Sequence, residues 1–347
     1  MSDKTKLAVI FGGASSEYGV SLKSAHSVLN NLNCEKYEII KIGITRDGRW
    51  YHYTGDNEKI LDGTWTQSNN NSCMFSPDTS VKSLIVIERD KIRNIAVDVV
   101  FPVLHGKNGE DGTIQGLLEM AGIPFVGCKM TASAACMDKG ITNTLLESAD
   151  IKKAKFVAFS VNDSESAIEE IEKKIAYPVF IKPANAGSSI GISKAHNRDE
   201  LIESIRLASV HDQKLVAEET VIGKEVECAV MGNEDPIASV VGEIEPCNDF
   251  YDYEAKYDME SNLYIPARID GKTAEKIRRE AIKAYKVMGC KGFSRIDFFV
   301  CENNDVVLNE INTIPGFTSI SMFPKLFEAS GISYPLLLDG LIELACL

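Results

Sequence analysis

Apolar and polar positions along the chain form blocks that predict strands and helices in turn. Residues 7–11 are apolar and lead into Gly12 and Gly13, which predicts a buried strand followed by a tight turn. The next apolar positions recur at the helical period, namely Val20, Ala25, Val28, Leu29 and Leu32. The pattern continues with strands expected at 37–45, 97–104 and 123–127, a helix at 113–121, and an Asn-rich surface loop at 67–73. Alternating strands and helices are typical of a parallel α/β layer.

The remaining two thirds of the chain predict two further groups of elements. A helix is expected at 131–149, in which Gly140 is an unusual choice for a helix interior. The other expected elements are strands at 155–160, 179–183, 214–219, 225–231, 237–245, 293–301 and 305–312, helices at 164–175, 198–209 and 272–288, and two C-terminal helices. The pattern therefore predicts an α/β protein of three units, 1–125, 126–213 and 214–347.

Composition narrows the class of protein. The chain has 347 residues, enough for two or three domains, and a formal net charge of −13. This charge disfavours nucleic acid and anionic membranes as partners, and no apolar run approaches the roughly 20 residues that cross a bilayer. The nine cysteines form no Cys-x-x-Cys pair, and the polar N-terminus does not resemble a signal peptide. We therefore expect a cytoplasmic protein with reduced thiols.

Two expected strands near the C-terminus carry polar residues on one face. Residues i and i+2 of a strand share a face, which groups Arg295 with Asp297 and Glu310 with Asn312. If the strands are neighbours, two carboxylates, an amide oxygen and a guanidinium lie together. Such oxygen ligands suit Mg²⁺ that also contacts nucleotide phosphates. The alternative is a solvated face with surface ion pairs, but apolar flanking residues indicate burial.

Two segments have features of a nucleotide site. Lys182 ends an apolar strand, where an ammonium needs an anion, and the small residues 187–191 that follow let backbone N–H groups approach phosphates. Such a loop alone is also typical of a flexible hairpin. Residues 218–225 could hold adenine and ribose or could form a charged interdomain loop. The Gly-x-Gly-x-x-Gly fingerprint of dehydrogenases is absent.

Other candidate residues follow expected strands of the first unit. Glu17 and residues 105–112 come after strand ends, where open α/β sheets bind ligands. A glutamate there could hold a substrate ammonium or simply complement a helix dipole. Residues 250–257 mix aromatic and charged side chains, which suits either a lid that excludes water or an ordinary packed loop.

Several motifs, in this order along the chain, together resemble the D-alanine–D-alanine ligase family of ATP-grasp enzymes. They are His-Gly-x-x-Gly-Glu-Asp-Gly-x-Ile-Gln-Gly at 105–116, Met-Asp-Lys at 137–139, Gly-Ser-Ser-x-Gly at 187–191, Tyr-Asp-Tyr-Glu-Ala-Lys-Tyr at 251–257 and Asn-Thr-x-Pro-Gly-Phe-Thr-Ser-x-Ser at 312–321. The resemblance implies an ATP-grasp fold, with a Rossmann-like open parallel sheet domain followed by central and C-terminal α+β domains. It also implies an ATP-dependent ligase that forms D-alanyl-D-alanine through a D-alanyl phosphate, for peptidoglycan precursor synthesis. A carboxylate–amine ligase with another substrate, or a nucleotide-binding regulator, is the competing interpretation.

The resemblance also implies roles for individual residues. For the nucleotide, it implies that Lys139, Lys182 and Ser189 serve the ATP phosphates, that Glu218, Glu219, Val221 and Glu225 serve adenine and ribose, and that Lys256 lies on the lid. Two Mg²⁺ (or Mn²⁺) ions are expected on Asp297, Glu310 and Asn312. Glu17 is expected to bind the ammonium of the first D-alanine, with His105 near its carboxylate, and Ser321 to bind the carboxylate of the second substrate. Ser188 and Tyr257 are expected to join Glu17 in closing the lid. Arg295 and the Gly316 region are expected to stabilise the oxyanion.

The second substrate is less narrowly defined. Residues 43–50 and 126–128 resemble the VanG-type D-alanine–D-serine ligases. Tyr257 disfavours D-lactate, because the D-lactate branch commonly has histidine there. Met322 follows Ser321 and is apolar, as in ordinary D-alanine ligases, so we expect D-alanine to be preferred, with D-serine as the alternative. The resemblance also implies a homodimer.

Overall fold

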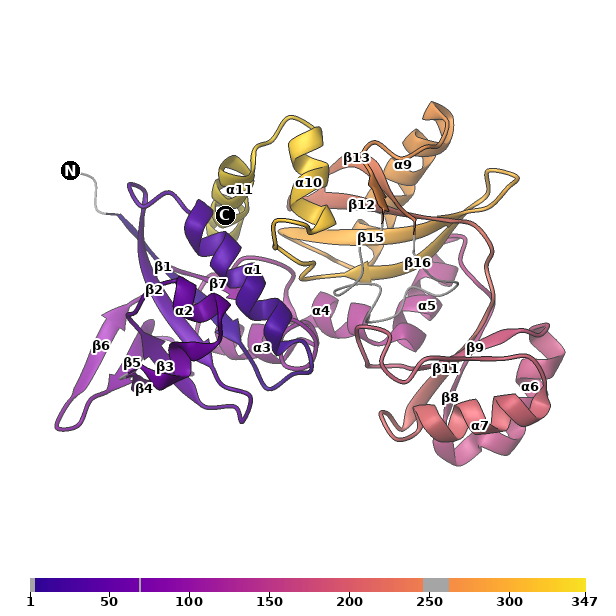
Figure 1. Ribbon diagram of the computed structural model, residues 1–347, viewed down its shortest axis with the longest axis horizontal. Coiled ribbons are helices and arrows are strands. Elements are labelled where there is room, and N and C mark those ends of the chain that lie inside the picture. The colour runs from indigo at the N-terminus through magenta and orange to yellow at the C-terminus, as the bar shows by residue number, and fades with distance from the viewer. Residues whose placement is uncertain (1–3, 69, 246–261) are drawn as a thin grey trace.

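Three β-sheets organise the chain in the computed structural model, which describes residues 4–68, 70–245 and 262–347 (Figure 1). The N-terminal sheet lies at one end of the molecule, and the C-terminal and central sheets lie at the other. The polypeptide therefore forms a mixed α/β structure, which confirms the predicted fold class.

The first sheet has the strand order β6-β5-β4-β3-β2-β1-β7. Its strands are β1 (Thr5–Gly12), β2 (Tyr37–Ile44), β3 (Trp50–Tyr53), β4 (Asn71–Phe75), β5 (Ser83–Ile87), β6 (Ile92–Ala96) and β7 (Val99–Val103). Its helical segments are α1 (Tyr18–Asn31), α2 (Glu58–Leu61), the 3₁₀ turn η1 (Thr64–Gln67) and α3 (Thr113–Met120). Only β2, β1 and β7 run parallel, since β3 to β6 add on antiparallel to β2 and to each other.

Two expectations for this unit are wrong. The predicted loop 67–73 ends inside a strand, because β4 starts at Asn71 and buries Cys73 and Phe75 on alternate positions. The predicted strand 123–127 contributes only a single parallel bridge to β7, from Phe125 to Val100, made by two backbone hydrogen bonds.

The second sheet is antiparallel, in the order β10-β9-β11-β8. Its elements and the helices before it are α4 (Met130–Met137), α5 (Lys139–Ser148), β8 (Phe156–Ser160), the 3₁₀ turn η2 (Val161–Asp163), α6 (Ser164–Lys174), β9 (Val179–Pro183), β10 (Ser193–Ala195), α7 (Arg198–Ala208) and β11 (Lys214–Glu219). The predicted helix 131–149 is two helices, because Asp138 leaves the helical conformation and caps α5. Gly140 therefore lies in a first turn and not in a helix interior. A Cβ there would lie 3.1 Å from the Ala158 Cβ, so glycine permits this close approach.

The third sheet is also antiparallel, in the order β14-β13-β12-β15-β16. Its elements are β12 (Lys224–Met231), β13 (Ile237–Glu245), β14 (Asn262–Tyr264), α9 (Gly271–Val287), β15 (Phe293–Val300), β16 (Val306–Asn312), α10 (Met322–Ala329) and α11 (Tyr334–Cys346). In the described part of the chain no single helix is long and apolar enough to cross a membrane; only α10 and α11 taken together, with a 104° bend, reach that length and composition.

One buried cluster joins the first and third units. It contains Val9 and Phe101 of the N-terminal sheet together with Phe317, Phe323 and Leu341 from the C-terminal part of the chain. The shared core fixes the two units against each other and so defines the cavity between them.

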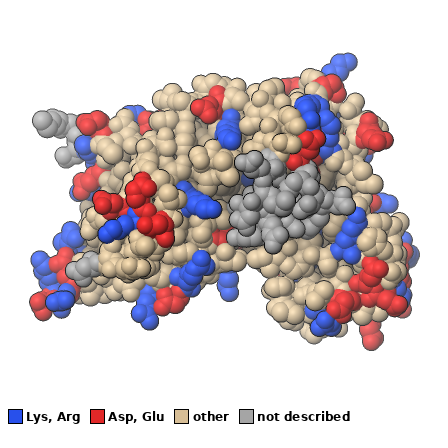
Figure 2. All heavy atoms as spheres, viewed as in Figure 1, with Lys and Arg blue, Asp and Glu red and all other residues tan. Residues whose placement is uncertain are grey.

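Positive and negative side chains are intermingled on the face shown in Figure 2.

Candidate active site

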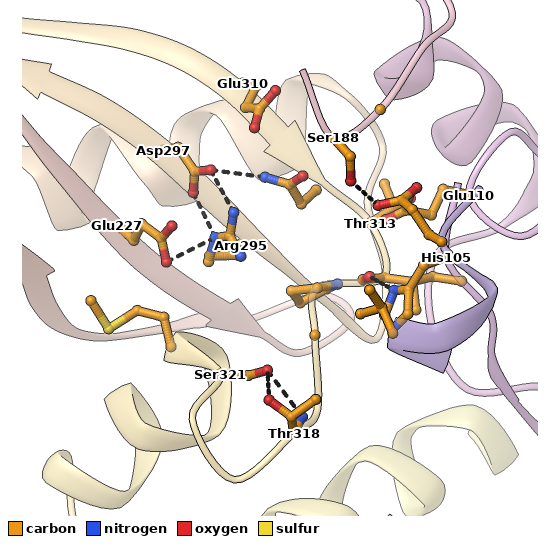
Figure 3. Close-up of a pocket in the computed structure, with 18 of the residues that line it drawn as sticks. His105, Glu110, Ser188, Glu227, Arg295, Asp297, Glu310, Thr313, Thr318 and Ser321 are labelled. Carbon is orange, nitrogen blue, oxygen red and sulfur yellow. Dashed lines mark hydrogen bonds and ion pairs between the residues drawn. The ribbon is translucent and has the colours of Figure 1, made fainter. Parts of the chain in front are cut away.

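A cavity of about 1110 Å³ lies where the three units meet (Figure 3). Side chains reach it from α1, α5, β9, β12, β15 and β16, and from the loops around residues 105, 187 and 316. The predicted site residues that line it are Glu17, His105, Lys139, Lys182, Ser188, Glu218, Glu225, Arg295, Asp297, Glu310, Asn312, Gly316, Ser321 and Met322. The fold therefore brings together residues that are up to 305 positions apart in the sequence.

The rest of the predicted set is placed differently. Ser189, Glu219 and Val221 are described residues that do not line the cavity. Glu219 instead accepts a hydrogen bond from the backbone N–H of Lys155, at 2.9 Å. Lys256 and Tyr257 lie outside the described residues.

Arg295 is the centre of a buried charge cluster on β15. Its Nε and Nη2 donate to the two carboxylate oxygens of Asp297, at 2.8 and 2.7 Å. Its Nε also lies 3.0 Å from Oε2 of Glu227 on β12, and Asn312 donates to Asp297 at 2.9 Å. Burial lowers the pKa of Arg295, but these carboxylates and Glu310 raise it well above its usual range, so the guanidinium is always charged.

The predicted metal ligands lie on neighbouring strands. Asp297 and Glu310 are directly paired between β15 and β16, and Asn312 pairs with Arg295 one step along the same face. Among the described residues no three His, Cys, Asp or Glu side chains are grouped so that they could hold a metal ion. The predicted ligand set does not count as such a group, because it has two carboxylates and one amide. The residues nevertheless fit Mg²⁺, which needs only one or two carboxylates when phosphates supply further oxygens.

A second charge cluster surrounds Lys182 at the end of β9. Its Nζ lies 2.5 Å from Oε2 of Glu218 on the adjacent strand β11, and Asn143 donates to the other oxygen at 2.7 Å. Burial alone would raise the pKa of Glu218, but Lys182, Lys153 and these hydrogen bonds lower it to about 2. The pair is therefore ionised, and the ammonium of Lys182 is held at the cavity wall.

Lys139 enters the same region from the first residue of α5. Asp138 caps this helix by accepting from the backbone N–H of Ile141, at 2.9 Å, and its carboxylate also pairs with Lys214. The Nζ of Lys139 donates to the backbone carbonyl of Ala186, at 2.6 Å. The cap thus fixes the start of the helix from which Lys139 projects.

Glu17 joins the first and second units directly. Its carboxylate accepts a hydrogen bond from the hydroxyl of Ser188, in the small-residue loop. A Cβ on Gly106 would lie 2.2 Å from Oε2 of Glu17, so only glycine lets the backbone approach this carboxylate. Ser188 and Ser189 both adopt positive φ, an uncommon conformation for residues other than glycine.

His105 holds the loop that follows β16. Burial lowers its pKa, so the ring is neutral, and Nδ1 lies 3.0 Å from the carbonyl of Ile314, which requires the proton on Nδ1. The other nitrogen accepts from the hydroxyl of Ser24, at 3.0 Å, and the same hydroxyl oxygen accepts from the backbone N–H of Phe317. Both ring nitrogens therefore help to hold the loop around Gly316, Nδ1 directly and the other nitrogen through the hydroxyl of Ser24.

The hydroxyl of Ser321 is also oriented by the chain. It accepts from the backbone N–H of Thr318, at 3.0 Å, and lies 2.8 Å from the hydroxyl of that residue. Ser321 directly precedes α10, and Met322 is the first residue of the helix.

Comparison with known proteins identifies the family. Residues 6–128 match the family model described as the D-ala D-ala ligase N-terminus, and residues 145–343 match the D-ala D-ala ligase C-terminus. The chain belongs to the D-alanine–D-alanine ligase family.

Relatives in this family are similar over nearly the whole chain. The D-alanine–D-alanine ligase of Acetivibrio thermocellus is 48% identical, over 99% of this chain and 96% of its own length. D-alanine–D-alanine ligase B of Clostridium tetani is 50% identical, over 99% and 94% respectively. These matches confirm the resemblance seen in the sequence motifs.

Solved structures of ligases agree with the fold. The VanG D-Ala:D-Ser ligase of Enterococcus faecalis has a TM-score of 0.93 and 48% identity, over 99% of this chain and all of that chain. The D-alanine–D-alanine ligase of Coxiella burnetii has a TM-score of 0.87 and 34% identity, over 99% of this chain and 94% of that chain. Membership of the family implies that this chain uses ATP and D-alanine.

Two cavity residues of this ligase were not singled out from its sequence. Glu227 is two residues after Glu225 on an expected strand, so the alternation that grouped Arg295 with Asp297 also places both glutamates on one face. Asn143 is four residues after Lys139 and shares its helix face, which brings it to Glu218. Both signals were present in the residue spacing.

Proposed function

We propose that this protein is an ATP-dependent ligase that joins two D-alanine molecules to give D-alanyl-D-alanine, ADP and phosphate, for peptidoglycan precursor synthesis. The observation that carries the proposal is the combination of residues in one cavity. Lys139 and Lys182 can meet phosphates, Glu17 can meet an ammonium, and Arg295 can meet a developing oxyanion. Phosphates, a substrate ammonium and an oxyanion are the three charged groups that an enzyme must bind when it activates a carboxylate with ATP and then joins it to an amine.

The proposed reaction begins with the first D-alanine held by Glu17. A carboxylate is a poor electrophile, so its oxygen takes the terminal phosphoryl group of ATP and forms D-alanyl phosphate. Lys139 and Lys182 hold the nucleotide phosphates during this transfer. Asp297, Glu310 and Asn312 would hold two Mg²⁺ (or Mn²⁺) ions, which neutralise phosphate charge when bound. We propose that Glu218, Glu219, Val221 and Glu225 bind adenine and ribose, and that Ser189 in the small-residue loop contributes to phosphate binding.

The second half of the reaction is acyl transfer. The amine of the second D-alanine, placed by Ser321, attacks the carbonyl carbon of the acyl phosphate, and phosphate leaves. Arg295 and a backbone N–H near Gly316 face the negative oxygen that develops, and His105 holds that loop in place. We further propose that Lys256, Tyr257 and Ser188 exclude water from the acyl phosphate.

Replacement of Arg295 tests the proposed chemistry. Arg295→Ala should lower kcat by about 10²–10³-fold, as for other oxyanion donors. The measurement is D-alanine-dependent release of ADP and phosphate. Turnover close to that of the unmodified enzyme would contradict the assignment of Arg295.

The choice of second substrate has its own test. The VanG D-Ala:D-Ser ligase and the D-alanine–D-alanine ligases of Acetivibrio thermocellus and Clostridium tetani are about equally similar to this chain in sequence, at 48–50% identity. Met322 lines the cavity and is buried and apolar, which supports D-alanine. An apolar pocket rejects an added hydroxyl only weakly, by about 10²-fold. Competition of D-alanine with D-serine should yield mainly D-alanyl-D-alanine, whereas mainly D-alanyl-D-serine would refute the preference.

The organisation of the molecule is part of the proposal. The three sheets support three units, and because β11 pairs with β8 and β9 we propose a second boundary near residue 220 in place of 213. We also propose a cytoplasmic homodimer. Sedimentation equilibrium of the purified chain tests the dimer, since a monomeric mass at micromolar concentration would overturn it.

A further inference from the structure

Glu227 is a buried carboxylate that the proposed reaction does not use. It is 6% exposed and lines the cavity on β12. It pairs in register with Asp297 on the adjacent strand β15, which places both carboxylates beside Arg295. Figure 3 shows contacts from the Arg295 guanidinium to both carboxylates. Burying a carboxylate is costly, so its position calls for a partner or a function.

Asp297 has two competing partners. Both of its oxygens accept hydrogen bonds from Arg295 in this structure. In the proposed function the same oxygens are metal ligands. A metal ion on Asp297 therefore weakens the contacts that orient Arg295, although the guanidinium is largely buried and needs an anion close by.

We propose that Glu227 is a positioning residue that holds Arg295 in place while Asp297 binds the metal. This inference rests on the proposed function, because it takes Asp297 as the metal ligand and Arg295 as the oxyanion donor. Oε2 of Glu227 forms an ion pair with Nε, at 3.0 Å, whereas Nη2 donates to Asp297 in this structure, so a metal ion on Asp297 would free Nη2 for the oxyanion while the Glu227 contact remains. It is the second carboxylate that allows Arg295 to release Asp297 without becoming an unpaired buried charge.

Metal binding provides a test that does not depend on catalysis. The probe is Mn²⁺, titrated into the full chain with saturating ADP and followed by electron paramagnetic resonance of free Mn²⁺. Glu227→Gln should raise the Mn²⁺ dissociation constant by about tenfold, because Arg295 then depends more strongly on its contacts with Asp297. Glu227→Asp, which keeps the charge, should recover much of this loss and covers the case in which the glutamine variant folds poorly.

A matched control separates this role from simple loss of a buried ion pair. Glu243 is 2% exposed on β13 of the same sheet, and Arg268 donates to it at 2.7 Å. Glu243→Gln removes a buried carboxylate from an arginine outside the cavity lining. Its Mn²⁺ dissociation constant should stay within about twofold of the unmodified protein, and a tenfold rise would contradict the proposal.

The deciding measurement is a double-mutant cycle with Arg295. In an Arg295→Ala background Asp297 has lost its competitor, so adding Glu227→Gln should change Mn²⁺ binding by less than about twofold. An equal tenfold loss of Mn²⁺ affinity in both backgrounds would show that Glu227 affects the metal site without Arg295. No loss of Mn²⁺ affinity in either background would show that Glu227 has no effect on metal binding. Either result overturns the proposal.

Turnover gives an independent readout on the same variants. Glu227→Gln should lower kcat by about 10- to 100-fold with the KM for ATP within about threefold, and should have little further effect on kcat in the Arg295→Ala background. The Mn²⁺ titration needs no D-alanine. Absence of D-alanine-dependent ADP release would therefore contradict the proposed function, whereas the double-mutant cycle of Mn²⁺ binding would still test the role of Glu227.

Discussion

At the scale of single residues, Glu110 carries an unusual protonation state. Its Oε2 accepts from the backbone N–H of Gly106, at 2.8 Å. Burial raises the pKa of this carboxyl to about 8, helped by the charges of Glu17 and Glu310 and opposed by Arg295. Glu110 is half-buried by solvent exposure, and the negative charges of Glu17 and Glu310 add to its desolvation, so its carboxyl is protonated more readily than an ordinary one.

This pKa predicts how stability depends on pH. A carboxyl whose pKa is higher in the folded than in the unfolded protein stabilises the fold fully below the unfolded value of 4.5 and loses that contribution as pH rises to about 8. Glu110→Gln keeps the acceptor oxygen but cannot ionise. The variant should therefore match the unmodified protein near pH 5 and be more stable at pH 9, in thermal unfolding at both pH values. A stability difference that is the same at pH 5 and pH 9 would contradict this.

At the scale of elements, the start of α5 couples folding to the site. Asp138 caps the helix and Lys139 is its first residue, so the cap determines where the Lys139 ammonium lies. Asp138→Ala should cost about 1 kcal/mol of stability through the lost cap. It should also raise the KM for ATP several-fold, as measured by thermal unfolding and steady-state kinetics.

A second variant separates the two contributions of Asp138. Asp138→Asn retains an oxygen that can accept from Ile141 but removes the charge that pairs with Lys214. It should keep most of the stability and most of the ATP affinity. If both variants behave alike, the ion pair and not the cap holds the helix.

Element prediction succeeded where one residue pattern settles the geometry. Alternation grouped Arg295 with Asp297 and Glu310 with Asn312, and the β15–β16 register confirms that the two strands are neighbours. It failed for four short strands of the first sheet, β3, β4, β5 and β6, although β5 (Ser-Leu-Ile-Val-Ile) is apolar. β6 exposes most of its five residues and β3 has only four, so neither shows a pattern distinct from a loop.

The contacts within the site were harder to predict than its members. The pairing of β12 with β15 is a tertiary fact, and without it Glu227 has no reason to be linked to Arg295. Likewise, the neutral ring of His105 and its bonds to Ser24 and Ile314 depend on a loop more than 200 residues away. Residue spacing identifies candidates, but only the fold assigns their partners.

At the scale of the whole molecule, the cavity is not cationic by its side chains alone. Among the described residues its lining includes seven carboxyl groups and five lysines and arginines, and even with Glu110 protonated the ionised carboxylates outnumber the cations. The carboxyl groups are those of Glu17, Glu110, Glu218, Glu225, Glu227, Asp297 and Glu310, and the cations are Lys23, Lys139, Lys182, Arg295 and Lys325. The expected binding of a triphosphate therefore depends on added metal cations.

Metal removal should consequently weaken nucleotide binding. In excess EDTA the dissociation constant for ATP should rise by at least about tenfold relative to buffer with Mg²⁺, as measured by isothermal titration calorimetry. Ca²⁺ at the same ionic strength provides a control for general screening. Equal ATP affinity with and without divalent cations would show that the lysines suffice.

The shared core also contains a contact that links the first unit to the loop around Gly316. The hydroxyl of Tyr334 on α11 donates to the carbonyl of Phe317, at 2.7 Å, and lies 3.3 Å from the hydroxyl of Ser27 on α1. The two rings also stack, with centroids 6.5 Å apart. Phe317 is adjacent to Gly316, so this contact and the His105 chain fix the same short segment from two sides.

Tyr334→Phe should therefore affect the fold and the reaction together. Loss of the buried hydrogen bond should lower stability by about 1 kcal/mol, and looser placement of the loop should lower kcat by up to about fivefold. Thermal unfolding and D-alanine-dependent ADP release measure the two effects. Ser27→Ala removes only the longer contact to the same hydroxyl and should change each quantity less. If kcat is unaffected while stability falls, the loop is held by His105 alone, and the interface between the units serves only the fold.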